Sequence, residues 1–279
     1  MFERLGPIQL AAIAQYARER FVPRGTTIKL GKRAEEVVLS IVDGELEAAA
    51  AAGSQRFGSG DVVGFVEQLS EAGTELVLTA TTDTMTLEFD WDAQLEICEE
   101  HFAVVMRYVE YLARQVVELA ERVPASETGA VALLEAQEFG KTLDLNERLL
   151  LLSRCGEFSS GCLDALSELG QHAVETHWRK GKKIWSAGQT ADHFFLIASG
   201  SVLCRADSGA ERVYRPGAVI GMHEALSGSR RQATAESTEK TLALRIDLEP
   251  FTDILEDHFD LSLDVLSMLA TKLDRIQNA

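Results

Sequence analysis

The segment from Pro216 to Ala235, PGAVIGMHEALSGSRRQATA, combines residue types that can bind an anion. Two adjacent arginines, Arg230 and Arg231, follow Gly221. Arginine makes charge-assisted hydrogen bonds to phosphate, often with two nitrogens at once. A glycine before a helix lets backbone N–H groups approach such an anion closely. The segment is therefore similar to a phosphate-binding loop.

Other residue patterns do not support metal binding or catalysis. His172 and His177 are five positions apart, so they would not lie on one helical face as a pair of metal ligands. The cysteines show no zinc-ligand spacing; they are Cys98, Cys155, Cys162 and Cys204. Nucleophile-elbow, P-loop and zinc-protease motifs do not occur. We predict no metal site, no catalytic site and therefore no enzyme.

Composition restricts the partners. The chain has 279 residues, enough for about two domains. Its net charge of −17 would repel a nucleic acid backbone, so we predict no nucleic acid partner. We therefore expect the partner to be a protein, whose identity the sequence does not give. The sequence has no apolar run long enough to span a membrane, and the unpaired cysteines indicate a reduced, cytoplasmic protein.

Two parts of the sequence repeat each other at an almost constant offset. Matching glycines and strand-like segments stand 156 positions apart at first and 157 positions apart later. The matched ranges are 21–28 with 177–184, 39–48 with 195–204, 57–64 with 214–221, and 79–90 with 235–247. This regularity indicates a duplicated domain.

Each copy has the pattern of a β domain with flanking helices. Residues 36–48 and 192–204 alternate apolar and polar side chains around Gly44 and Gly200, which predicts strand-turn-strand units. We therefore predict a mainly β protein with two tandem jelly-roll barrels, at 21–90 and 178–247.

The flanking helices set the predicted domain limits. Apolar spacing predicts helices over 7–21, 93–122, 145–154, 162–173 and 251–276. The predicted domains are 1–122 and 146–279, and a linker over 123–145 joins them. The apolar face of the helix over 93–122 makes a homodimer through this helix an alternative to packing within one chain.

Each copy resembles the cyclic-nucleotide-binding domains of kinase regulatory subunits and bacterial catabolite regulators. In the second copy the resemblance rests on KGKKIWSAGQTADHFFLIASGSV (180–202) and YRPGAVIG (214–221); in the first copy it rests mainly on the repeat. It implies an eight-stranded jelly roll, or double-stranded β-helix, with a short helical cassette between two strands. It also implies a role in regulation and signalling.

The family cassette reads glycine, glutamate, small apolar residues, then proline-arginine-alanine-alanine-threonine. The resemblance implies that its arginine grips a cyclic phosphate and its glutamate binds the ribose. Here Met222 stands at the glutamate position, so the sugar contact is either lost or made by a neighbour; Glu224 could substitute only if the cassette helix were shifted. The candidate ligand-binding residues are Gly221, Met222, His223, Glu224, Arg230, Arg231 and Thr234. We expect Arg231 to be exposed, so that its replacement by alanine would spare the fold.

The first cassette departs further from the family pattern. Phe65 occupies the glutamate position and Thr74 the arginine position. The nearby acids Glu67, Glu71 and Glu75 would repel a phosphate. The second copy is more basic between Gly200 and Ala235, with Arg205, Arg212, Arg215, Arg230 and Arg231. We predict no cyclic nucleotide in the first copy.

The sequence leaves two functions open. The first is a non-catalytic regulatory or adaptor protein that acts through protein–protein contacts and has lost ordinary cyclic AMP binding. The alternative is a sensor that binds a cyclic nucleotide or another anionic metabolite in the second barrel only. Neither requires a resident cofactor.

Overall fold

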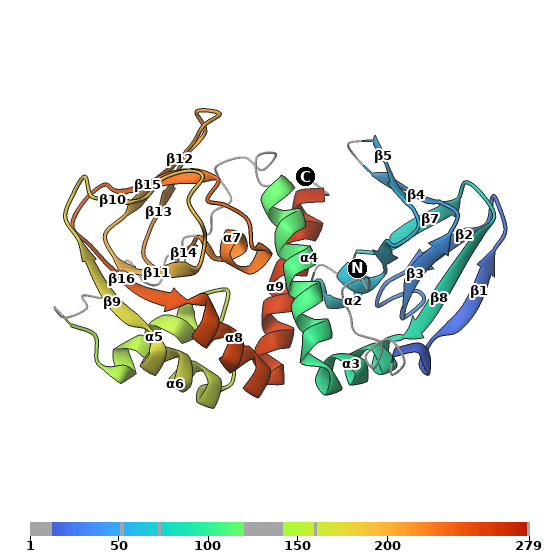
Figure 1. The fold of residues 1–279 in the computed structure, drawn as a ribbon, viewed down its shortest axis with the longest axis horizontal. Coiled ribbons are helices and arrows are strands. Elements are labelled where there is room, and N and C mark those ends of the chain that lie inside the picture. Colours follow the sequence, from blue (N-terminus) through green and yellow to red (C-terminus); the bar gives the residue numbers. More distant parts are fainter. Residues whose placement is uncertain (1–12, 51–52, 72–73, 120–141, 159–160, 278–279) are drawn as a thin grey trace. The chain divides into compact units, whose positions relative to one another are not determined.

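The computed structural model describes residues 13–50, 53–71, 74–119, 142–158 and 161–277 (Figure 1). The chain divides into two compact units. Unit 1 comprises Met1–Leu112 together with Leu266–Ala279, and unit 2 comprises Ala113–Val265.

Unit 1 contains two four-stranded antiparallel sheets. One sheet has the strand order β1-β8-β3-β6 and the other has the order β2-β7-β4-β5. The strands are β1 Arg18–Val22, β2 Thr27–Leu30, β3 Val37–Asp43, β4 Leu46–Ala50, β5 Gly53–Phe57, β6 Val62–Val63, β7 Leu76–Ala80 and β8 Thr84–Asp90.

Unit 2 repeats this arrangement strand for strand. Its sheets have the orders β9-β16-β11-β14 and β10-β15-β12-β13, which match those of unit 1 when each strand number is raised by eight. The strands are β9 Val174–Trp178, β10 Lys183–Trp185, β11 His193–Ser199, β12 Val202–Ala206, β13 Glu211–Tyr214, β14 Val219–Ile220, β15 Ala233–Ser237 and β16 Thr241–Asp247. The prediction of two tandem jelly rolls is confirmed.

The repeated glycines mark the same tight turn in both barrels. Gly44 and Gly200 have φ angles of 95° and 82°. A Cβ atom would lie 2.6 Å from the carbonyl oxygen of Asp83 in the first turn and 2.5 Å from that of Lys240 in the second. Only glycine fits such a backbone, which explains why both copies carry glycine at this turn.

Helices lie before, between and after the strands. They are α2 Phe65–Leu69, α3 Trp91–Glu100, α4 Phe102–Leu119, α5 Leu145–Arg154, α6 Leu163–His172, α7 Met222–Ser227, α8 Leu248–Asp257 and α9 Phe259–Gln277. The single helix predicted over 93–122 is broken at His101, which has a non-helical φ of −132°.

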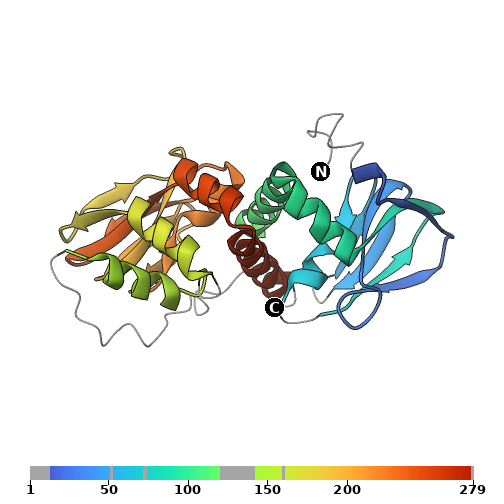
Figure 2. The ribbon, with the colours of Figure 1, turned by 90° about the horizontal axis from the view of Figure 1, so that it is seen from below.

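The two helices before the second barrel lie side by side (Figures 1 and 2). Asp144 and Glu147 form a capping box that fixes the start of α5. Arg148 then donates to the carbonyl oxygens of Gly170 and Ala173 at 3.0 and 2.8 Å, which ties the start of α5 to the end of α6. The pair is therefore antiparallel, as the predicted helices over 145–154 and 162–173 require.

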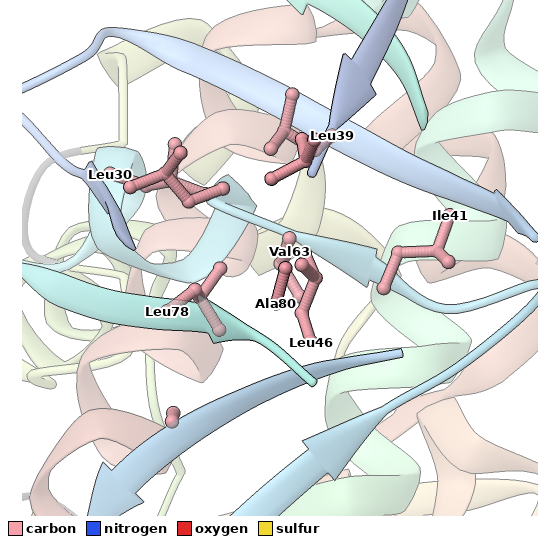
Figure 3. Close-up of a cluster of buried hydrophobic side chains, with 10 residues drawn as sticks. Leu30, Leu39, Ile41, Leu46, Val63, Leu78 and Ala80 are labelled. Atoms are coloured by element: carbon pink, nitrogen blue, oxygen red, sulfur yellow. The ribbon is translucent and has the colours of Figure 1, made fainter. Parts of the chain in front are cut away.

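Each barrel encloses its own apolar core. Figure 3 shows aliphatic side chains from opposite strands of unit 1 meeting, among them Leu30, Leu39, Leu46 and Leu78. The core of unit 2 is more aromatic and includes Trp178, Trp185, Phe195, Ile197, Val202 and Ile220. This difference matters because Trp185 also contacts the second cassette.

Some predicted limits differ from the structure. The helix predicted over 7–21 is helical only at Ile13 and Ala14 within its described part, and Arg18 begins β1. Pairing with β8 favours the strand, since Arg20 reaches Glu88 at 2.8 Å. The predicted linker over 123–145 falls almost entirely outside the described residues. Within the described residues, every helix is too short or too polar to cross a bilayer.

Candidate ligand-binding cassettes

The second cassette consists of α7 and the segment that leads to Arg231. Gly221 follows β14 and caps the start of α7 with a left-handed φ of 81°. A Cβ atom at this position would lie 2.2 Å from Nη1 of Arg231. Glycine is therefore needed both for the backbone conformation and for the close approach of the arginine.

Arg231 is buried, and its guanidinium is bound within the fold. Its exposed fraction is 2%, so the expectation of an exposed arginine is wrong. Nη1 donates to the carbonyl oxygen of Gly221 at 2.9 Å, and Nη2 donates to the carbonyl oxygen of His193. The guanidinium carbon also lies 4.1 Å from the centroid of the Trp185 ring, which is a cation–π contact.

The backbone of Arg231 is held as firmly as its side chain. Its N–H donates to the carbonyl oxygen of Gln189 at 2.9 Å, and its carbonyl oxygen accepts from the N–H of Gly188 at 2.8 Å. Both partners lie in the loop after β10. The arginine therefore joins three parts of the barrel: this loop, the start of β11, and the start of α7.

Negative charge already surrounds Arg231. Burial lowers the pKa of Arg231, while the charges of Glu224 and Asp192 raise it. Burial, with the charge of Glu224, also raises the pKa of Cys204 to about 12. The carboxylate of Glu224 therefore lies close enough to act on Arg231 and Cys204 together. An incoming phosphate would meet this carboxylate near the arginine.

One atom of this arginine lacks a partner. Within the described residues, Nε of Arg231 is buried and makes no hydrogen bond. A buried donor without an acceptor is costly, and a buried positive charge is stabilised by an anion. This is the feature of the cassette that favours an anionic ligand.

The other predicted site residues are spread over the cassette. Met222 is 1% exposed and packs in the interior, whereas Arg230 is exposed and donates to the carbonyl oxygen of Gly188 at 2.8 Å. Oγ1 of Thr234 accepts from the N–H of Ala187 at 3.1 Å. His223 and Glu224 are half-buried on α7. The fold brings Gly221, Arg231 and Glu224 together but commits Arg230 and Thr234 to backbone contacts.

Sequence analysis missed two contributors, Trp185 and His193. Nε1 of Trp185 donates to the carbonyl oxygen of Ala233 at 2.9 Å, which orients the ring beneath Arg231. His193 contacts Asp192 at 2.5 Å. Burial and the nearby arginines Arg231 and Arg245 lower the pKa of His193 despite this partner. The sequence offered one signal for these two residues: a tryptophan ends β10 and a histidine begins β11.

The first cassette is built from apolar contacts. Gly64 caps α2 with a φ of 94°, as Gly221 caps α7. Phe65 is 4% exposed and stacks on Tyr108, with ring centroids 3.6 Å apart and planes 6° apart. Its ring also meets the edge of Trp91 at 5.8 Å. The position of the family's ribose-binding glutamate is thus part of the core of unit 1.

Metal binding finds no support in the described part of the chain. His, Cys, Asp and Glu side chains do not gather there in groups of three or more that could hold an ion. The cysteines are free thiols: Cys98, Cys155, Cys162 and Cys204.

Comparison with known proteins identifies the second barrel. The family model for the Cyclic nucleotide-binding domain matches residues 175–258. This range includes all but the first residue of β9, then β10 to β16 and the second cassette. A search of curated proteins finds no match.

Solved structures with the same type of fold have low sequence identity. The regulatory domain of Toxoplasma gondii PKA with cAMP is 12% identical over 96% of this chain and 90% of that chain, with a TM-score of 0.38. A regulatory subunit of a cAMP-independent protein kinase A from Trypanosoma cruzi, bound to guanosine, is 14% identical over 91% and 80%, with a TM-score of 0.36.

A third structure covers a single domain. The N-terminal domain of a transcriptional regulator from Streptomyces coelicolor A3(2) is 21% identical over 46% of this chain and 96% of that chain, with a TM-score of 0.42. Such low identities and TM-scores carry no argument about ligand or activity. The family model matches the second barrel, and the repeated strand order gives the first barrel the same topology: the chain consists of two barrels of one fold, the second of which matches the Cyclic nucleotide-binding domain family.

Proposed function

We propose that this protein is a non-catalytic regulatory or adaptor protein that acts through protein–protein contacts and has lost ordinary cyclic AMP binding. The proposal rests on the hydrogen bonds that the guanidinium of Arg231 makes within the fold. Its Nη atoms donate to the carbonyl oxygens of Gly221 and His193, so they hold the cassette together. The side chain that would grip a phosphate is used as a structural support.

The surroundings of Arg231 support the same proposal. A cyclic nucleotide would need an acceptor for its ribose hydroxyl, but Met222 at that position is an apolar side chain in the interior. It would also need to approach Arg231 against the charge of Glu224, which already acts on that guanidinium. Each factor lowers the affinity for a cyclic nucleotide.

The first barrel gives no substitute site. Phe65 and Thr74 replace the two polar anchors of the family cassette, and Phe65 is stacked on Tyr108. With neither cassette suited to cyclic AMP, contacts with a protein partner are the way in which we propose that the barrels act. The cytoplasmic setting, where the free cysteines would stay reduced, belongs to the same proposal.

Isothermal calorimetry with the full chain tests the loss of cyclic AMP binding. We expect no saturable heat with cyclic AMP or cyclic GMP in the micromolar range. Loss of the ribose carboxylate alone removes a hydrogen bond worth about 1.5–3 kcal/mol, or roughly one to two orders of magnitude in affinity. Micromolar binding of either nucleotide would contradict the proposal.

A second candidate function is a sensor of another anion in the second barrel. It is favoured by the buried Nε of Arg231, which has no acceptor among the described residues. A thermal-shift series with phosphate, cyclic dinucleotides and nucleoside monophosphates tests this candidate. Glu224→Gln removes the competing negative charge, so it should enlarge the stabilisation by a true ligand. Equal shifts for Glu224→Gln and the unmodified protein would speak against a site at Arg231.

The predicted homodimer through residues 93–122 remains a proposal. Its motivation is the apolar face of this helix, which includes Val105, Val109, Leu112 and Val116. Light scattering at micromolar concentration distinguishes the alternatives. A mass near 30.6 kDa would reject the dimer.

A further inference from the structure

The last turns of α9 contact the first cassette through polar side chains. Residues 266–277 of α9 belong to unit 1, and Figure 2 shows this end of the helix near α2. Oγ of Ser267 donates to the carbonyl oxygen of Leu69, the last residue of α2, at 3.0 Å. Oγ1 of Thr271 accepts from the N–H of Glu71 at 3.1 Å. The helix thus binds backbone groups where α2 ends.

Asp274 completes this set of contacts. Its carboxylate is 6% exposed and accepts from Oγ of Ser70 at 2.8 Å and from Oγ1 of Thr74 at 2.9 Å. The repeat aligns Thr74 with Arg231 of the second cassette. A carboxylate from α9 therefore binds the residue that stands at the arginine position of the first cassette.

The three side chains form one continuous face. Ser267, Thr271 and Asp274 are spaced by four and three residues, which places them one above another on a helix. Leu266, Leu269 and Leu273 on the same turns are buried. We name the three polar residues the α9 clasp.

The helix of the second cassette ends on its own backbone. Gly228, the residue after α7, has a left-handed φ of 66°, and the N–H of Ser229 donates to the carbonyl oxygen of Glu224 at 3.0 Å. The repeat places Glu71 at the position of Gly228. A glutamate does not readily adopt that left-handed conformation, so α2 cannot end in the same way. Ser267, together with Lys32 at the carbonyl oxygen of Ser70, supplies the missing contacts.

We propose that the α9 clasp is a built-in ligand of the first cassette, which closes α2 and makes this cassette respond to the position of α9 instead of a diffusible nucleotide. The proposal does not depend on whether the second barrel binds an anion. It gives the first copy a regulatory role that its lost polar anchors do not provide.

The buried hydrogen bonds of Asp274 explain why the clasp would act as one unit. A buried carboxylate is stable only while its donors are in place, and Ser70 is fully buried as well. Loss of Asp274 would leave the hydroxyl groups of Ser70 and Thr74 without this acceptor. The contact between Thr271 and Glu71 lies one helical turn away and should open with it.

Native-state hydrogen exchange in the full chain tests the clasp residue by residue. The N–H of Glu71 reports on the clasp because it donates to Thr271, whereas the N–H of Ser70 reports on α2 because it donates to Val66 at 2.8 Å. Asp274→Ala should speed exchange at Glu71 by about ten- to a hundredfold, the effect of losing charge-assisted hydrogen bonds. Exchange at Ser70 should change far less. Asp260→Ala, at an exposed acid of the same helix, is the matched control and should change neither amide.

A second variant and a measurement with nucleotide make the test decisive. If Asp274→Ala does not fold, Thr271→Val removes the acceptor of the Glu71 amide with little change in volume and should speed exchange at Glu71 alone. Cyclic AMP at millimolar concentration should leave exchange at Glu71 of the unmodified protein unaltered. An unchanged Glu71 amide in the clasp variants would overturn the proposal. So would equal acceleration at Ser70 and Glu71, or protection of Glu71 by added nucleotide.

Discussion

The guanidinium of Arg231 lies over the ring of Trp185, with its carbon 4.1 Å from the ring centroid. The same guanidinium donates to the carbonyl oxygen of Gly221, so one side chain links the barrel core to the start of α7. An arginine in this position stabilises the domain whether or not a ligand binds. Mutation of Arg231 should therefore affect the stability of unit 2 as well as any ligand binding.

Arg231→Ala should destabilise unit 2. The substitution removes a buried side chain and leaves the carbonyl oxygens of Gly221 and His193 without their donor, at a cost of about 2–4 kcal/mol. Chemical denaturation measures the change. Arg230→Ala is the matched control, since Arg230 is exposed, and should stay within about 0.5 kcal/mol of the unmodified protein. Equal effects of the two substitutions would contradict the structural role of Arg231.

Phe65→Ala should destabilise unit 1 to a similar or greater degree. The ring is buried between Tyr108 and Trp91, and deletion of a buried phenylalanine ring costs about 3–5 kcal/mol. Thermal unfolding monitored by calorimetry measures the loss. Phe21→Ala removes the same ring from a side chain that is 56% exposed, and should have little effect. A loss below about 1 kcal/mol at Phe65 would argue against its place in the core.

The stability of unit 1 should depend on the protonation of Glu67. Burial, with the charge of Asp274, raises the pKa of Glu67 from 4.5 to about 7. The folded state then binds this proton more tightly than the unfolded state. Stability from Glu67 is therefore full at acid pH, falls as pH rises from about 4.5 to about 7, and stays reduced above that range.

Denaturation at pH 5 and pH 8 can isolate this contribution. Glu67→Gln keeps the shape but cannot ionise, so it should stabilise the protein more at pH 8 than at pH 5. Glu75→Gln, at an exposed neighbouring acid, is the control for general charge effects. If both variants gave the same difference between the two pH values, the raised pKa of Glu67 would not be supported.

The fold could be predicted from sequence because its main signals are local. Gly44 and Gly200 mark turns that only glycine can form, and alternating strands flank each of them. The repeat doubled every signal, so a weak first copy could be interpreted through the second. The break at His101 and the strand that begins at Arg18 were missed because they depend on how neighbouring elements pack.

The site was harder to predict because its contacts join distant parts of the sequence. A charged residue is usually exposed, so Arg231 was expected at the surface. Its burial depends on Trp185 and His193, which lie on other strands. The α9 clasp was missed for a similar reason, since Ser267 and Thr271 interrupt an apolar helix in the way that solvent-facing residues do. Two hydroxyl residues and an acid at helical spacing were the only local signal.

Nuclear magnetic resonance of the arginine side chains tests the central claim most directly. The claim is that the Nη groups of Arg231 are committed to Gly221 and His193 and do not serve cyclic AMP. We expect slowly exchanging Nη protons in the free protein and an unchanged Nε–H signal at about 1 mM cyclic AMP, where only binding stronger than about −4 kcal/mol would register. Freely rotating Nη groups, or a saturable shift of the Nε–H signal at micromolar cyclic AMP, would contradict it.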